Sequence, residues 1–88
     1  MPYLLFTYPN SPRCDDLKQH LFTSGLEGDE FSLTRKESKL KIRDYLRVIK
    51  RDDTGGIIIP TLVIEEQGDV VTVVNDHEGL SDWLRSRG

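Results

Sequence analysis

Apolar and polar residues change their spacing along the chain, and the first third predicts a strand followed by a helix. Residues 3–8 form an apolar, aromatic run closed by Pro9, which is typical of a buried strand. Ser11 and Pro12 then supply a capping residue and a first-turn proline, the usual start of a helix. Gly25 is placed to end that helix, because glycine tolerates the left-handed conformation after the last turn. The apolar residues expected on one face of this helix are Cys14, Leu17, Leu21 and Phe22.

The middle of the chain predicts a short strand and a second helix. Phe31 and Leu33 alternate with polar neighbours, as in a strand with one buried face. Thr34 and Glu37 have the spacing of a capping box, in which two side chains satisfy the first free amides of a helix. The apolar residues that follow recur at i, i+3, i+4 and i+7, which is the spacing of one helical face. They are Ile42, Tyr45, Leu46 and Ile49.

The last third predicts a hairpin and a closing helix. Residues 57–64 and 70–74 are two β-branched stretches, the first of them containing Pro60. Gln67, Gly68 and Asp69 separate them and are typical of a hairpin turn. An apolar stripe on a short C-terminal helix follows, made of Leu80, Trp83 and Leu84. The predicted order is therefore β-α-β-α-β-β-α.

This order predicts one α/β domain spanning residues 1–88. A strand, a helix and a second strand in succession form a right-handed unit with parallel strands, while the last two strands form an antiparallel hairpin. Together they give a four-stranded mixed sheet with helices on both faces. Composition supports a folded chain. Hydrophobic residues make up 36% of the sequence, none of them is alanine, and almost all have large side chains.

Charge is distributed unevenly along the chain. The formal net charge is −3, yet most of the 12 basic residues lie within residues 35–51, beside only Glu37 and Asp44. This predicts either one surface that faces anions or an ordinary solvated helix. The segment lacks interleaved aromatic residues and the protein is acidic, so we expect no nucleic-acid partner. The apolar runs are far shorter than a membrane span, and no secretory signal is visible, so we expect no membrane partner and a cytoplasmic location.

The chemistry-bearing side chains are few. Cys14 is the one cysteine, which excludes an intramolecular disulfide and a multi-cysteine zinc site. His20 lies two turns into the first helix and His77 precedes the last one, and each is interpreted as a solvated histidine rather than part of a catalytic triad. We therefore expect no metal site.

Three motifs, in order along the chain, resemble the glutaredoxin branch of the thioredoxin-fold superfamily. Ser11-Pro12-Arg13-Cys14 stands where family members carry Cys-Pro-Tyr-Cys, at the junction of the first strand and helix. Ile58-Ile59-Pro60 stands in place of Thr-Val-Pro, whose proline is cis. Gly79-Leu80-Ser81-Asp82-Trp83-Leu84 is similar to the Gly-Gly-Cys-Asp-Asp-Leu that opens the family's last helix. The resemblance covers essentially the whole chain and implies a thioredoxin-like fold with the first strand beside the third.

The resemblance also implies what the chain has lost. In glutaredoxins the first cysteine of the motif is the nucleophile, and here that position is Ser11. Thiol-disulfide exchange requires a thiolate, so the dithiol reaction is not expected. Cys14 occupies the place of the second cysteine, followed by Asp15 and Asp16, which disfavour a neighbouring anion. Cys14 is therefore either a small buried hydrophobe or a monothiol with some reactivity, and whether the protein is an enzyme stays open.

Glutathione is the one cofactor that the resemblance suggests. By position, the backbone of Ile59 before a cis Pro60 would pair with the tripeptide, and the start of the last helix at Ser81 and Asp82 would hold its γ-glutamyl carboxylate. Pro12 and Arg13 complete the candidate ligand-binding set beside Ser11. Basic residues near the second helix would take the glycyl carboxylate, with Arg47, Lys50 and Arg51 as candidates.

Three functions remain open at this point. The first is a glutaredoxin-like monomer that binds glutathione, a thiol compound or an extended peptide of a partner protein without dithiol chemistry. The second is a non-enzymatic interaction domain on a thioredoxin fold, using the basic second helix or the groove beside Pro60. The third is a monothiol oxidoreductase that acts through Cys14. A shared fold does not decide between them.

Overall fold

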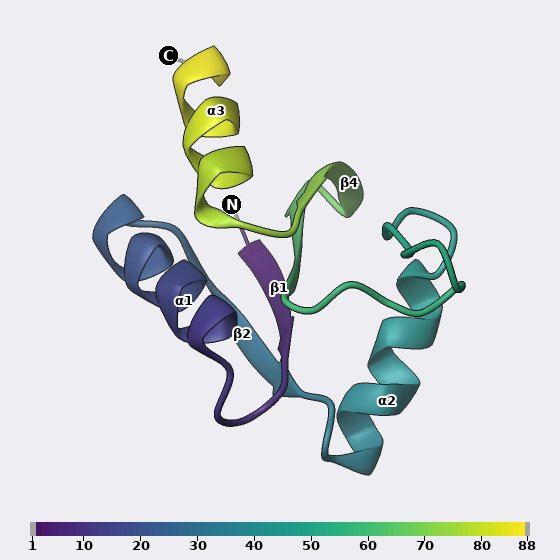
Figure 1. Cartoon of the computed structure of the whole chain (residues 1–88). Helices are drawn as coiled ribbons and strands as arrows, with labels where there is room; N and C mark the ends of the chain where they lie inside the picture. The colour runs from purple at the N-terminus through teal and green to yellow at the C-terminus, as the bar shows by residue number, and fades with distance from the viewer. Residues whose placement is uncertain (1, 88) are drawn as a thin grey trace.

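The computed structural model describes residues 2–87 and has the predicted order of strands and helices (Figure 1). A single turn of 3-10 helix, η1, extends the second helix. The elements are β1 (Pro2–Thr7), α1 (Pro12–Ser24), β2 (Glu27–Ser32), α2 (Lys36–Ile42), η1 (Arg43–Tyr45), β3 (Thr61–Glu66), β4 (Asp69–Val74) and α3 (His77–Arg87). Within these residues no helix is long and apolar enough to cross a membrane.

The four strands form one mixed sheet in the order β2-β1-β3-β4. β1 runs parallel to β2 and antiparallel to β3, and β3 runs antiparallel to β4. The first strand therefore lies beside the third, as predicted. Figure 1 shows α1 and α3 on one side of the sheet and α2 on the other, so the α/β class with helices on both faces is confirmed.

Alternation along the two central strands divides the core into two layers. Successive side chains of a strand point to opposite faces. Leu5 therefore faces α1 and α3, whereas Leu4 and Phe6 face α2. The buried residues of the first layer are Leu5, Leu17, Leu21, Leu62, Ile64, Val74 and Leu80. Those of the second are Leu4, Phe6, Leu33, Ile42, Ile49 and Val63.

Helix α1 begins and ends where the sequence predicts. The Ser11 side chain accepts a hydrogen bond from the Cys14 amide (3.4 Å), and Gly25 takes a left-handed conformation with φ of 80°. The expectation that Phe22 lies on the buried face is wrong, since this residue is 89% exposed. Leu17 and Leu21 define a narrow stripe toward the sheet, and one further residue turns about 100° away from it.

Helix α2 differs from its prediction in its start and its length. Arg35 occupies the capping position without a side-chain hydrogen bond, so the Thr34–Glu37 capping box is wrong. The Thr34 hydroxyl instead lies 2.9 Å from the hydroxyl of Ser32. The regular helix ends at Ile42 and continues as η1 and turns, yet Ile49 still reaches the core.

The last helix begins earlier than the resemblance implies. Asp76 accepts a hydrogen bond from the Gly79 amide (2.7 Å) and thereby caps α3, whose first residue is His77. Ser81 and Asp82 consequently lie inside the helix and not at its N-terminus. The motif that opens the family's last helix therefore does not open α3.

Two strands also begin at different residues from those that the sequence predicts. The β-branched stretch from residue 57 becomes a strand only at Thr61, directly after Pro60. Gln67 and Gly68, with φ of 53° and 85°, form the two-residue turn of the predicted hairpin. β2 begins at Glu27, before the apolar residues that predicted it.

Gly28 gives a test of this sheet, because a side chain there would collide with β1. A Cβ atom at this position would strike the carbonyl oxygen of Tyr3 and lie 2.6 Å from Cδ1 of its ring. We predict that Gly28→Ala lowers the free energy of unfolding by about 1–3 kcal/mol, measured by urea denaturation. The adjacent exposed change Glu27→Ala should stay within about 0.5 kcal/mol of wild type. Equal values for the two variants would contradict the β1–β2 register.

Candidate functional site

The register of the two central strands places the predicted site at one end of the sheet. Phe6 lies opposite Thr61, so the segment that leaves β1 and the segment that enters β3 meet at the same end. The first carries Ser11 into α1, and the second carries the Ile59-Pro60 bond. This bond is cis, as predicted.

Cys14 is a core residue in the structure. It is 1% exposed, carries a free thiol and lies on the face of α1 that also buries Leu17 and Leu21. The Ser11 hydroxyl in front of it is engaged as the helix cap. Ser11 thus holds a hydroxyl that stabilises the helix, and the Cys14 sulfur is covered.

Asn75 braces the segment that contains the cis bond. From the end of β4, its amide Nδ2 donates to the carbonyl oxygens of Ile58 (3.3 Å) and Pro60 (2.9 Å) and to the Thr61 hydroxyl (3.1 Å). The Thr61 hydroxyl donates in turn to the Ile58 carbonyl. The Asn75 Oδ1 atom is buried without a partner among the described residues. Asn75 was not singled out in the sequence, because its role depends on a contact between distant segments.

The bracing leaves the backbone of Ile59 available. No hydrogen bond within residues 2–87 involves its N–H or its carbonyl oxygen, although its side chain packs against the second core layer. Pro60 is buried beside it. The N–H and carbonyl of Ile59, which the resemblance implies as pairing groups, therefore have no partner within the described residues.

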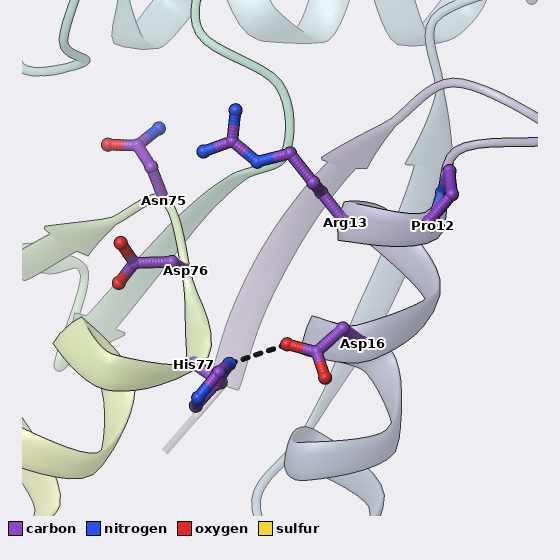
Figure 2. Close-up of a pocket in the computed structure, with 6 residues that line it drawn as sticks. All are labelled: Pro12, Arg13, Asp16, Asn75, Asp76 and His77. Carbon is purple, nitrogen blue, oxygen red and sulfur yellow. Dashed lines mark hydrogen bonds and ion pairs between the residues drawn. The ribbon is translucent and has the colours of Figure 1, made fainter.

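A pocket of about 310 Å³ lies between the starts of α1 and α3 (Figure 2). In Figure 2 the Arg13 side chain extends from α1 toward the side on which Asn75 and Asp76 lie. Two helix N-termini meet here, and their free amides favour negative charge, whereas two aspartates in the wall oppose it. The lining residues are Pro12, Arg13, Asp16, Asn75, Asp76 and His77.

Other residues expected at the site lie elsewhere. Asp82 is exposed on α3 and pairs with Arg85, and neither Asp82 nor Ser81 lines this pocket. The basic candidates also lie outside the pocket, in the exposed segment that follows α2. These are Arg47, Lys50 and Arg51.

Two groups with shifted pKa values lie within and just after the basic segment of residues 35–51, at Tyr45 and Asp52. Burial, followed by the nearby Glu65 carboxylate, raises the pKa of Tyr45, whose hydroxyl donates to Glu65 on β3 (3.2 Å). The side-chain hydrogen bond from Thr54, followed by the amide of Gly56, lowers the pKa of Asp52 in the turn after the segment. Both contacts lie outside the pocket and position the charged surface rather than the site.

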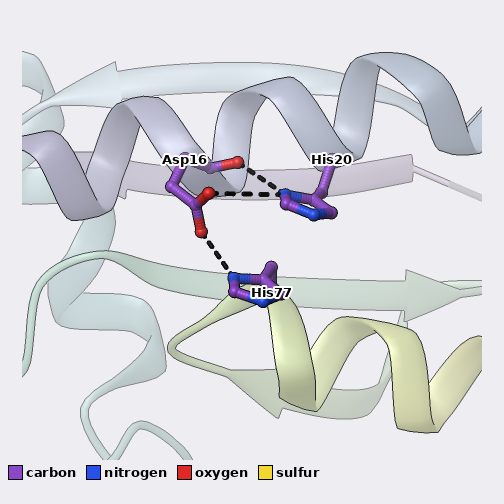
Figure 3. Close-up of side chains that lie close together, drawn as sticks. All are labelled: Asp16, His20 and His77. Atoms are coloured by element: carbon purple, nitrogen blue, oxygen red, sulfur yellow. Dashed lines mark hydrogen bonds and ion pairs between the residues drawn. The ribbon is translucent and has the colours of Figure 1, made fainter.

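Both histidines of the chain meet in one cluster beside the pocket. Each side chain is 41% exposed, as expected of a solvated histidine, but the sequence did not indicate that the two rings meet. The rings of His20 and His77 stack with centroids 4.4 Å apart and planes 10° apart. Asp16 joins them, with its Oδ2 atom 2.5 Å from Nδ1 of His77 (Figure 3). The i, i+4 spacing of Asp16 and His20 on a helix was the one sequence signal for this cluster.

Two solved structures have a similar arrangement of strands and helices. A single-site mutant of the thioredoxin-like protein BC3987 matches with a TM-score of 0.62 at 20% identity, covering 93% of this chain and 97% of that one. BC3987 without that mutation matches with a TM-score of 0.58 at 23% identity, covering 91% and 96%. No family model and no curated protein matches the sequence. The chain therefore has a thioredoxin-like fold, as predicted, and identities this low show the fold alone.

Substitution of Asn75 tests whether its hydrogen bonds hold the segment that contains the cis bond. Asn75→Asp removes the donor and places a carboxylate among two carbonyl oxygens, so we expect it to destabilise the protein more than Asn75→Ala at pH 7. Each loss should be about 1–3 kcal/mol, measured by urea denaturation, with faster amide exchange at Ile59.

A pH series separates charge repulsion from lost packing. Partial burial without donors raises the pKa of the introduced carboxyl above its value in the unfolded chain, so the folded state binds its proton more tightly. Lowering the pH through that raised pKa should therefore bring the stability of Asn75→Asp toward that of Asn75→Ala. A gap that stays constant down to pH 4 would contradict the assigned orientation of the amide.

Proposed function

We propose that this protein binds glutathione or another extended peptide through backbone pairing and does not carry out dithiol exchange. The observation that carries the proposal is the combination of a buried Cys14 with an unpaired Ile59 backbone. The first removes the reacting sulfur from the surface. The second leaves a donor and an acceptor where a ligand backbone can pair.

Backbone pairing supplies the affinity in this proposal. An extended ligand adds to an exposed backbone edge by exchanging hydrogen bonds with one residue, which requires a free N–H and a free carbonyl on the same side. Ile59 has both, and Asn75 holds the neighbouring carbonyls so that the segment is rigid before binding. A rigid segment loses little entropy on binding.

The pocket sets the chemical preference of the ligand. A carboxylate near the start of α1 or α3 gains from the free helix amides and from Arg13. Asp16 and Asp76 in the same wall repel it, and the basic segment is outside the pocket. We therefore expect weak binding of glutathione, with a millimolar dissociation constant equivalent to about 4 kcal/mol.

An NMR titration tests the binding site. Reduced glutathione should shift the amide signals of Ile59, Arg13 and His77 in a saturable way, and S-methylglutathione should do the same because the sulfur takes no part. Arg13→Gln should weaken binding several-fold, whereas Arg85→Gln, a matched change on the exposed face of α3, should not. Amide shifts confined to residues 35–51, or no shifts at all, would reject the groove and favour the interaction domain.

Replacing Ser11 tests the absence of exchange chemistry. The unaltered protein should show no measurable disulfide reductase activity, since Cys14 is covered and stands alone. Ser11→Cys should form a disulfide between positions 11 and 14, detectable as a loss of two hydrogens by intact mass. Ser11→Ala serves as the matched control. Robust activity in the unaltered protein, lost in Cys14→Ser, would show that Cys14 reacts as a monothiol and would overturn the proposal.

A further inference from the structure

The cluster of Asp16, His20 and His77 has the composition of a metal site. One carboxylate oxygen and one nitrogen from each ring lie within 4.8 Å of one another. Asp16 and His20 come from one side of α1, and His77 is the first residue of α3, 61 positions after Asp16. Two rigid helices thus bring three potential ligands to one point, as Figure 3 shows.

Hydrogen bonds in the cluster determine which ring atoms are free. The Nδ1 atom of His20 lies 2.9 Å from the backbone carbonyl oxygen of Asp16, which can only accept, so Nδ1 carries the proton. The lone pair of His20 is therefore on Nε2. Metal-binding histidines commonly donate their other nitrogen to a backbone carbonyl in this way, because the bond fixes the tautomer and the ring.

His77 and Asp16 are held together by a proton that a metal ion can replace. The 2.5 Å separation between Asp16 Oδ2 and His77 Nδ1 places a hydrogen bond between two atoms that are each good ligands. When an ion binds both atoms, Nδ1 gives up that proton, and the neutral His77 ring then carries its proton on Nε2. The pair therefore exchanges one hydrogen bond for two metal bonds.

We propose that Asp16, His20 and His77 form a binding site for one divalent transition-metal ion, with Zn²⁺ as the ion that this ligand set suits. Two imidazoles and one carboxylate are a ligand combination that zinc accepts, with water or an added ligand completing four-coordination. Magnesium and calcium prefer sites made entirely of oxygen atoms. The proposed site borders the pocket, since Asp16 and His77 also line its wall.

Zinc binding requires side chains of the cluster to rotate. Stacked rings 4.4 Å apart cannot both direct an in-plane lone pair at one ion, so binding turns at least one ring out of the stack. The Asp16 side chain is 47% exposed, and that of each histidine is 41% exposed, which leaves room for rotation. One potential ligand atom of each residue already lies within 4.8 Å of the others, so rotation of these side chains is the change needed to reach the ~2.0–2.2 Å bonds of zinc.

Titration of the untagged protein with Zn²⁺ tests the site. We expect saturable calorimetric binding of one ion per chain and chemical-shift changes in both imidazole rings, which are the only ones in the sequence. His20→Ala, His77→Ala and Asp16→Asn should each weaken binding by at least ~10-fold. Mg²⁺ should not compete.

Matched variants identify other sources of binding. Asp15→Asn removes an adjacent exposed carboxylate that contacts Lys18, and Cys14→Ser removes the one thiol, so both should bind zinc like the unaltered protein. Circular dichroism of each variant checks that the fold is retained. Non-saturable binding, binding unchanged in both histidine variants, or loss of binding in Cys14→Ser would each overturn the proposal. Zinc binding and glutathione binding are measured in separate titrations, so a negative result for one ligand does not decide the result for the other.

Discussion

Phe6 lies opposite Thr61 where β1 and β3 run antiparallel, and the position of every candidate group depends on this register. The same pairing directs Leu5 and Leu62 toward α1 and α3, and it directs Val63 toward α2. A shift of one residue would reverse both core layers, because successive side chains face opposite sides of the sheet. The burial of the two layers therefore fixes the register, and the register places the start of α1 beside the segment that contains Pro60.

Polar contacts at this end of the sheet then define which backbone groups remain free. Asn75 and Thr61 take up the carbonyls on either side of Ile59, so the carbonyl of Ile59 is the unpaired one among residues 58–60. A flexible loop with several free amides would lose entropy on binding, whereas a braced residue is already in place. Asn75 donates through its amide nitrogen, while its amide oxygen is buried without a partner in the described chain. Its contribution to the site therefore depends on where the nitrogen points and not on hydrogen bonds to every polar atom of the side chain.

The parts of the fold that local chemistry determines could be predicted from the sequence. Ser11 and Gly25 bound α1 correctly, since a cap and a left-handed glycine act within a few residues. The start of α3 was missed, because Asp76 offered a stronger cap than the motif that begins at Gly79. The histidine cluster could not be predicted, because His20 and His77 meet only after the sheet has set the spacing of two helices.

The charges around the starts of α1 and α3 disfavour a thiolate and favour a bound cation. A thiolate gains from a helix N-terminus and from basic neighbours, but Asp15, Asp16 and Asp76 surround these helix starts with negative charge. The same acids offset the partial positive charge of the helix ends and make the pocket wall more favourable for a cation. A buried Cys14 and a carboxylate beside two imidazoles are thus consistent with each other, because neither needs an electropositive helix start.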